Sequence, residues 1–501
     1  MNPRKASLTR ILPYLFFKIA PVPRHGIRNF VAMSALMFCI LCSQSFLRVL
    51  KDSVLISEVN VEIIAFIKLY FVLPIAWVFV VLYSKISNKL PYTKIYYYIL
   101  SFFLLFFLLF AFFLYPNAES FHIKASTIAH FTSNFPGMRW YGLLIGNWSY
   151  TVFYVLAELW PDVMYVFLFW QLANRITTTY QAKSLYPMLS FFGNSSVVLT
   201  GILVAQLSSM DCWIYKSFSG VESKYVLVRV CVSLLTFVGI LSMYLVHLIS
   251  VKLVKDPCLY QIRPSELPKI STLEGLKYVT RSKFLWLIVL CSTSFYFGMN
   301  LVEVLWKAKV RELYPSVESY SHIISLCTTW TGVVTMIMNA VGKNLMRYCS
   351  WKTIFSISPV IMTISGVAFF LISVFPVHFV YLQSAYVTVS ALQLAVFVGA
   401  IQNVLAKGVK YSLWDVSKEM LYIPLDYNMK TKGKAATDLV GSKLGKALSG
   451  LVPVILLSFS GFSNYISMAP IIMGMFVVVC GVWFFGVRLL SKEYQKIKSS
   501  S

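Results

Sequence analysis

The chain has 501 residues, of which 58% are apolar and only 13% are charged. Soluble globular domains are roughly 45–50% apolar and about 25% charged, so this composition excludes a soluble globular protein. The apolar residues form long continuous runs, such as Ile95–Tyr115, and lack the alternation of a membrane β-barrel. A helix needs about 20 residues to cross the hydrocarbon core. We therefore expect an all-α polytopic membrane protein.

We predict about twelve transmembrane helices along the chain. Their approximate bounds are 29–48, 62–83, 95–115, 145–173, 184–207, 225–250, 284–305, 320–342, 353–375, 380–406, 435–459 and 464–488. The fourth contains Pro161, which could divide it into two helices. We favour one continuous helix there, because an even number of spans gives a regular alternation of charge between the connections.

The net charge of +25 comes mainly from an uneven distribution of lysine and arginine. With the N-terminus inside, 31 of these residues fall in the two tails and the even-numbered connections, against ten in the odd-numbered connections. This is the positive-inside pattern, and it predicts that both termini are cytoplasmic. An alternative reading of some of the charge is attraction of a polyanionic substrate.

The basic stretch 251–283 divides the chain into two similar parts. We expect a cytoplasmic tail at 1–28, a six-helix half at 29–250, a cytoplasmic linker at 251–283, a second half at 284–488 and a tail at 489–501. Two six-helix halves joined in this way are the plan of major-facilitator-like carriers. A short internal repeat agrees, because Arg48–Lys51 and Glu303–Lys307 close the first and seventh spans in similar ways.

Four charged residues lie within or at the ends of predicted spans. They are Lys68 in the second, Glu158 in the fourth, Glu303 in the seventh and Lys446 in the eleventh. A charge at the centre of a span costs about 2.5–3.5 kcal/mol and usually faces a polar cavity. Snorkelling to an interface or a structural ion pair is the alternative for each. Two lysines and two acids, shared between the halves, favour a cavity that binds phosphate.

Enzymatic and metal chemistry find little support in the sequence. Cys39 and Cys42 form a C-x-x-C within an apolar helix, where packing is the simpler explanation. The segment Gly441–Lys446 is one residue too short for a phosphate-binding loop, and Ala447 replaces the Ser or Thr that would hold magnesium. We therefore expect a transporter with no cofactor and no bound metal.

Several segments resemble the nucleotide transporters, or ATP/ADP translocases, of plastids and obligate intracellular bacteria. The resemblance covers about residues 30–495. It rests on Leu47–Asp52, Phe66–Lys68, Ala157–Trp160, Phe169–Asn174, Asn300–Lys307, Gln402–Leu413, Tyr422–Asp426 and Lys432–Ala436. The family is a group of twelve-helix, major-facilitator-like carriers, unrelated in fold to the mitochondrial carrier. The resemblance implies transport roles for four residues: Lys68, Glu158, Glu303 and Lys446. These are the same four that were selected above because a charge within a span is costly.

The chain departs from the family pattern at two of these segments. Pro161 follows A-E-L-W where a glycine is frequent, and Ala447 follows Lys446 where a serine is frequent. The resemblance implies exchange of a host nucleoside triphosphate, with ATP expected, for an internal diphosphate, with ADP expected. Proton-coupled or exchange import of another nucleotide or phosphorylated metabolite is the alternative.

The remaining expectations concern weaker candidates for substrate contacts, the membrane in which the protein lies, and its partners. Arg48 and Lys410 are candidates for guiding the anion, and Phe153 or Trp306 for stacking on the base. We expect a bacterial inner membrane rather than a plastid envelope, since no transit segment of useful length precedes the first span. The expected partners are nucleotides and the lipid bilayer, with no nucleic acid and no obligate protein partner.

Overall fold

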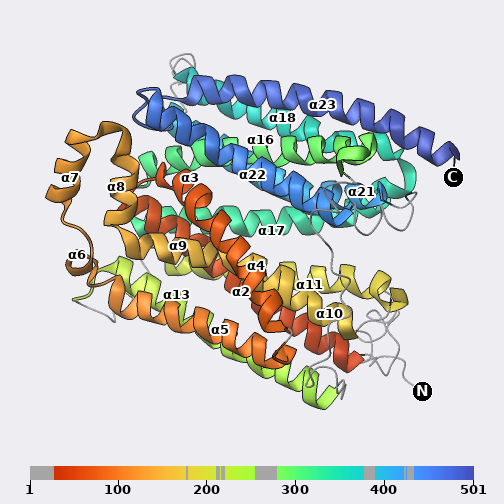
Figure 1. Ribbon diagram of the computed structural model, residues 1–501, viewed down its shortest axis with the longest axis horizontal. Helices are drawn as coiled ribbons and strands as arrows, with labels where there is room; N and C mark the ends of the chain where they lie inside the picture. Colours follow the sequence, from red (N-terminus) through yellow and green to blue (C-terminus); the bar gives the residue numbers. More distant parts are fainter. Residues whose placement is uncertain are drawn as a thin grey trace, which may run out of the picture.

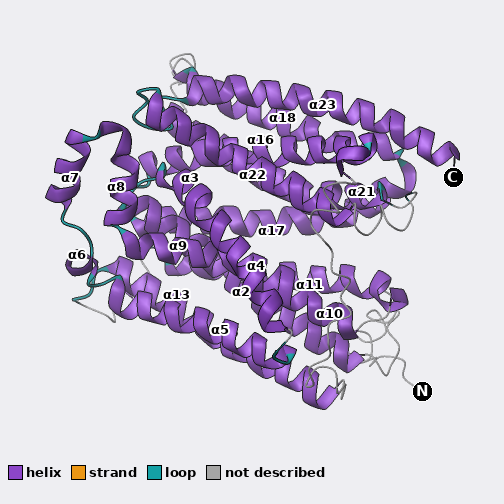
Figure 2. Ribbon diagram, in the orientation of Figure 1, coloured by secondary structure: helices purple, strands orange, loops and turns teal. Residues whose placement is uncertain are grey.

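The computed structural model describes residues 27–87, 89–176, 179–209, 215, 220–253, 279–376, 390–422, 425 and 434–500. These residues are almost entirely helical, and none of them forms a strand (Figure 2). The N-terminal tail before residue 27 and linker residues 254–278 lie outside the described part, as does the start of the tenth predicted span.

Helices occur at the positions of all twelve predicted spans. They are α2 (Ile27–Glu58), α3 (Ile63–Ile67) with η2 (Lys68–Val72) and α4 (Leu73–Ser87), α5 (Tyr92–Leu109) with η3 (Phe110–Leu114), α9 (Trp148–Trp160) with η5 (Pro161–Phe169) and α10 (Trp170–Ile176), α11 (Thr179–Leu207), α13 (Ser223–His247) with η6 (Leu248–Leu253), α16 (Lys283–Leu313), α17 (Val317–Tyr348), α18 (Trp351–Val374), α20 (Ala391–Val409) with η7 (Lys410–Trp414) and α21 (Asp415–Met420), α22 (Lys434–Phe459), and α23 (Ala469–Ser500). Within the described residues, eleven spans have the length and apolarity to cross a membrane, and the shorter apolar helix Ile63–Phe79 supplies a twelfth.

Two helices extend well beyond the ends predicted from hydropathy. The first continues to Glu58 rather than residue 48, and the seventh continues to Leu313 rather than residue 305. Both extensions carry lysines whose charge lowers the local hydropathy, so the apolar run stops before the helix does. The two helix ends are therefore wrong in the prediction, and Lys51 and Lys307 lie in helices rather than in loops.

The predicted fourth span is one continuous helical segment, as expected. Pro161 lacks a backbone N–H, and the helix accommodates it by changing to π-helical geometry at η5 before α10 resumes. The connection before this span is itself structured, because α6 (Ala118–Phe121), α7 (Ala125–Asn134), η4 (Pro136–Met138) and α8 (Arg139–Gly146) lie there.

The helices form two groups that correspond to the two parts of the chain (Figure 1). In the first group α2 packs against α9, α11 and α13, and in the second α16 packs against α20, α22 and α23. The groups meet where α17 contacts α2 and α11, and where α22 contacts α3. The start of α2 and the end of α23 lie at the same end of the molecule, which we call the terminal end, and the opposite end is the far end (Figure 1).

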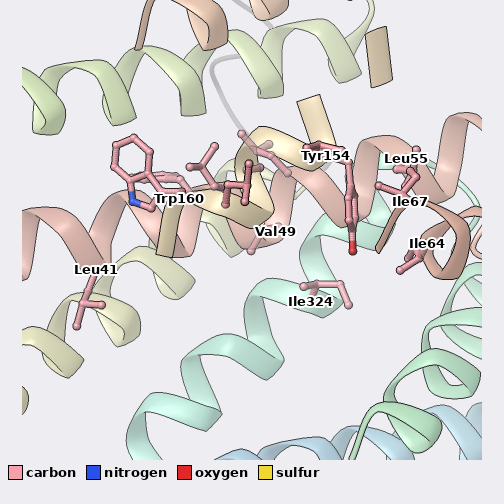
Figure 3. Close-up of a cluster of buried hydrophobic side chains, with 14 of the residues drawn as sticks. Leu41, Val49, Leu55, Ile64, Ile67, Tyr154, Trp160 and Ile324 are labelled. Atoms are coloured by element: carbon pink, nitrogen blue, oxygen red, sulfur yellow. The ribbon is translucent and has the colours of Figure 1, made fainter. Parts of the chain in front are cut away.

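The interior between these helices is apolar and rich in aromatic side chains. Large residues such as Trp160, Tyr154 and Trp306 are almost completely buried. Figure 3 shows part of this core, with contributions from α2, α3, α9 and α17: Leu41, Val49, Leu55, Ile64, Ile67, Tyr154, Trp160 and Ile324. Dense packing of this kind gives the charged residues described below a surrounding of low polarity.

Small residues allow the two halves to approach closely where α11 crosses α17. A Cβ atom at Gly201 would lie 2.2 Å from the Thr329 hydroxyl oxygen and 2.8 Å from the Thr329 backbone nitrogen. A Cβ atom at Gly332 would lie 2.6 Å from the side chain of Val198. Glycine at the crossing therefore permits backbone contact between halves, as small residues do in other membrane helix pairs.

We expect Gly201→Val to lower the melting temperature of the purified protein by several degrees. The added atoms would meet backbone as well as side chain on α17, and overpacking of this kind typically costs about 1–3 kcal/mol. Gly474→Val on α23 is the control, because nothing lies within 4 Å of a Cβ at that position. Thermal unfolding in detergent measures both, and equal melting temperatures for the two variants would contradict the close crossing.

Candidate functional site

A buried carboxylate joins the two halves of the molecule. The two oxygens of Asp52 accept from Lys51 Nζ at 3.1 Å and from Lys307 Nζ at 2.9 Å. Lys51 belongs to α2 in the first half, and Lys307 belongs to α16 in the second. The Asp52 and Lys307 side chains are only 3% and 5% exposed. Because an unpaired buried ion costs several kcal/mol, each of these charges depends on the others.

The ion pairs continue from this carboxylate to two of the acids that the sequence singles out. Lys51 Nζ lies 2.8 Å from Glu158 on α9, and Lys307 Nζ lies 3.3 Å from Glu303 one turn earlier on α16. Glu303 also contacts Lys407 of α20 at 3.2 Å. We call this network the charge layer, and its members are Lys51, Asp52, Glu158, Glu303, Lys307 and Lys407.

An aromatic residue holds one of these lysines in place. Lys51 Nζ lies 4.3 Å from the ring centroid of Tyr154 and 3.3 Å from the Tyr154 hydroxyl oxygen. Tyr154 is one turn before Glu158 on α9 and is fully buried. The ring provides a cation–π interaction and the hydroxyl oxygen accepts a hydrogen bond, so Tyr154 stabilises the Lys51 ammonium in two ways.

A polar pocket adjoins the charge layer between the halves. It is small, with a free volume of about 20 Å³, and its walls come from α2, α16, α17 and α20. Arg48, Lys407, Thr328 and Asn403 contribute charged and hydrogen-bonding groups to it. Cations, hydroxyls and an amide at one place are the groups that bind phosphate oxygens.

The four residues that were selected because of the cost of burying a charge in a span lie around the charge layer. Lys68, the first residue of η2, interacts electrostatically with both Glu158 and Glu303. Lys446 on α22 is exposed, and it also interacts electrostatically with Glu158. Lysines from the two halves therefore face one carboxylate. Their contact with a substrate stays a prediction.

The two weaker candidates both lie within about one helical turn of the charge layer. Arg48 lines the polar pocket one turn before Asp52 on α2. Lys410 begins η7, three residues closer to the terminal end than Lys407, and its Nζ lies 4.1 Å from the ring centroid of Tyr411 and 5.7 Å from that of Tyr296. Both are therefore near the interface between the halves, with Arg48 on the terminal side of Asp52 and Lys410 on the terminal side of Lys407.

Sequence reasoning missed four members of the charge layer: Lys51, Asp52, Lys307 and Lys407. It placed the three lysines in connecting segments, because a charged residue at the end of an apolar run looks like the start of a loop. The internal repeat contained the missing signal, since Lys51 and Lys307 are its equivalent positions and both bind Asp52.

The two proposed base-stacking aromatics, Phe153 and Trp306, are both largely buried. Phe153 is 1% exposed and stacks on Phe110 with ring centroids 4.1 Å apart. Trp306 is also buried, and its indole N–H donates to the Val396 carbonyl oxygen at 2.9 Å. Phe153 therefore has little free surface, whereas Trp306 also lines the polar pocket, and a stacking role for either ring stays a prediction.

A second ion pair links the halves closer to the terminal end. Asp162 in η5 lies 3.3 Å from Lys443 on α22, and each side chain is 37% exposed. Asp162 follows Glu158 by about one helical turn, and Lys443 precedes Lys446 by about one helical turn. Exposure thus increases from the buried Asp52 toward the terminal end, which indicates that the interface between the halves is more accessible from that side.

The far end is closed by polar contacts between the halves. The Arg311 guanidinium donates to the Val59 carbonyl oxygen at 3.1 Å and to the side chain of Asn60. The backbone N–H of Tyr465 donates to Glu62 at 3.0 Å, and the Ser223 hydroxyl donates to Glu318. All of these groups lie in or beside the connections that follow α2, α11, α16 and α22. No group of three or more potential metal ligands occurs among the described residues.

We expect Asp52→Asn to destabilise the protein strongly, because it leaves Lys51 and Lys307 facing each other without the shared carboxylate. Removing one partner of a buried ion pair typically costs about 3–5 kcal/mol. The control is Glu312→Gln, which disturbs the pair between Lys309 and Glu312, where Glu312 is 45% exposed and such pairs contribute about 1 kcal/mol or less. Melting temperatures in detergent compare them, and a fall for Glu312→Gln as large as for Asp52→Asn would contradict the assignment.

Comparison with known proteins places this arrangement in a family. A family model described as TLC ATP/ADP transporter matches residues 8–494. The chain is 46% identical over 480 residues to ADP,ATP carrier protein 5 of Rickettsia felis and to that of Rickettsia prowazekii, covering 95% of this chain and 96% of each relative.

A solved bacterial homologue of the iron transporter ferroportin, in an inward-facing state, has a TM-score of 0.58 at 12% identity and covers 93% of this chain and 100% of its own. At that identity the likeness concerns the fold, which is the two-half plan of major-facilitator-like transporters. The match of the family model over nearly the whole sequence decides the assignment. The chain belongs to the TLC ATP/ADP transporter family and is a membrane transporter, not an enzyme.

Proposed function

We propose that this chain exchanges ATP for ADP across a bacterial inner membrane by alternating access. The observation that carries the proposal is the convergence of lysines from both halves on one buried, polar interface. The relatives named ADP,ATP carrier proteins support ATP and ADP as the pair of substrates.

The charge balance of the site favours a polyanion. Five lysines lie in or beside the charge layer, namely Lys51, Lys68, Lys307, Lys407 and Lys446, and they outnumber its three carboxylates. Cations in a poorly solvated interior attract phosphate much more strongly than they do in water. Nucleotide phosphates would supply the negative charge that the protein leaves unmatched.

The contacts between the halves suggest which side is open. Arg311, Glu62 and Glu318 close the far end, whereas the groups nearer the terminal end are more exposed. If the termini are cytoplasmic, as the positive-inside pattern predicts, this conformation faces inward. Release of the far-end contacts and closure at the terminal end would expose the same site to the outside.

Obligate exchange follows from the cost of leaving the site empty. When a nucleotide departs, the lysines lose their phosphate partners, and the halves would have to move past each other with unmatched charge. Binding of a second nucleotide restores the balance and permits the return step. Glu158 and Glu303 each have a lysine at salt-bridge distance, so neither is a free carboxyl suited to carry a proton.

We expect proteoliposomes loaded with ADP to take up labelled ATP, and unloaded proteoliposomes to take up almost none. The physical reason is that the empty carrier reorients slowly. A protonophore should leave the uptake unchanged. Uptake into unloaded vesicles that depends on an imposed proton gradient would contradict exchange and favour proton-coupled import.

We expect Lys68→Ala and Lys446→Ala each to lower the rate of ATP–ADP exchange at subsaturating substrate by roughly 10- to 150-fold. A hydrogen bond to a charged group contributes about 1.5–3 kcal/mol, and each variant removes one such contact. Lys496→Ala is the matched control, because Lys496 is an exposed lysine that pairs with Glu493 at the end of α23. Exchange rates that are equal in all three variants would remove these lysines from the site.

A further inference from the structure

A group of tyrosines lies between the halves on the terminal side of the charge layer. Tyr165 belongs to η5 of the first half, and Tyr296 and Tyr411 belong to α16 and η7 of the second. We call these three residues the tyrosine layer. Nothing in the ion-pair network or in the proposed phosphate contacts uses them.

The tyrosine layer is offset from the charge layer in the same direction on three helices. Tyr165 is seven residues after Glu158, and Tyr296 is seven residues before Glu303 on a helix of opposite direction. Both are therefore about 10 Å closer to the terminal end than the acid on the same helix. Tyr411 is four residues after Lys407, which places it about 6 Å in the same direction.

The tyrosine layer lies where the two halves meet, because η5 reaches the second half through the ion pair of Asp162 with Lys443 at 3.3 Å, and the Lys410 ammonium of the second half lies 4.1 Å from the Tyr411 ring centroid. Tyr165 of η5 interacts electrostatically with Tyr411 and Lys410 of η7. Tyr296 interacts with Lys410 and Tyr411, and the Lys410 ammonium lies 5.7 Å from its ring centroid. Arg48, at the edge of the polar pocket, interacts with Lys410 and Tyr411 as well. The tyrosine layer therefore lies on the terminal side of the pocket beside the charge layer.

These rings differ from the aromatic residues of the core. Tyr411 is 39% exposed, and Tyr165 and Tyr296 are partly buried, whereas Phe153 and Trp306 are almost completely enclosed. Tyr165 and Tyr411 also lie in π-helical stretches, which occur frequently at functional sites because they shift side chains out of regular register. Tyr165 packs against Phe169 and Trp170 of its own half, with ring centroids 6.1 Å and 6.0 Å apart, and it retains part of its surface for a further planar group, as Tyr296 and Tyr411 do.

A nucleotide has two ends that require different partners. Its phosphates need cations, and its base needs a flat apolar face with a hydrogen-bond donor at the edge. The charge layer meets the first requirement, while the tyrosine rings with the Lys410 ammonium meet the second. The offset of about 6–10 Å between the layers leaves room for the sugar between the two ends.

We propose that Tyr165 and Tyr411 hold the nucleobase of the transported nucleotide between the two halves, with Lys410 at the edge of the base. This inference rests on the proposed nucleotide exchange and assigns the orientation of the substrate. The phosphates point toward the far end, and the base points toward the terminal end. One ring comes from each half. The contacts to the base, like those to the phosphates, would therefore change when the halves move relative to each other.

The test is equilibrium binding of labelled ATP to the purified protein, with competition by unlabelled inorganic tripolyphosphate. Tripolyphosphate carries the phosphate chain without a base, so it reports on the charge layer alone. Tyr165→Ala and Tyr411→Ala should each weaken ATP binding by roughly 5- to 150-fold, the range found when a base-stacking aromatic is truncated. The inhibition constant of tripolyphosphate should change less than twofold in both variants.

Two controls separate stacking from a general loss of structure. Tyr411→Phe keeps the ring and should bind ATP within a few-fold of the wild type. Phe397→Ala removes an exposed aromatic from α20, the helix that leads into η7, and should leave both ligands unaffected.

The outcomes that overturn the inference are distinct from those that overturn the proposed function. Unchanged ATP binding in both tyrosine-to-alanine variants, or equal weakening of ATP and tripolyphosphate, would exclude a base subsite here while leaving nucleotide exchange intact. A wild-type protein that binds tripolyphosphate but no nucleotide would overturn both.

Discussion

The ion pairs of Asp52 with Lys51 and Lys307 are the constraint on which the rest of the interface depends. A buried charge in a membrane-spanning helix is tolerated only when a partner compensates for its lost hydration. Here one carboxylate compensates two lysines, one from each half. The position of α2 relative to α16 is therefore coupled to electrostatics as well as to apolar packing. Any motion that separates the halves at this depth must supply another anion to these lysines.

Departures from regular α-helix coincide with the positions that the transport model needs. Lys68 begins η2, Tyr165 lies in η5, and Lys410 and Tyr411 begin η7. In η5 the cause is local, since Pro161 cannot donate to the helix and the backbone widens to accommodate it. The other two stretches contain no proline. Such π-helical turns occur frequently at functional sites.

Much of the architecture could be predicted from the sequence because lipid imposes a simple rule on it. The apolar runs located all twelve spans, and burial cost selected Glu158 and Glu303, both of which belong to the charge layer. Lys51 and Lys307 were missed because pairing within the protein allows a charged residue where hydropathy predicts a loop. The tyrosines were missed for a different reason. Aromatic residues are frequent throughout this chain, and only the three-dimensional arrangement distinguishes a ring that faces the interface from one that packs in the core.

A structure with nucleotide bound tests the central claim most directly, which is that lysines from both halves bind the phosphates of one substrate. Cryo-electron microscopy of the protein with ATP should show density for the phosphate chain within hydrogen-bonding distance of ammonium groups from each half, with Lys68 and Lys446 among them. Phosphate density bound to one half only, or located away from the charge layer, would contradict this account.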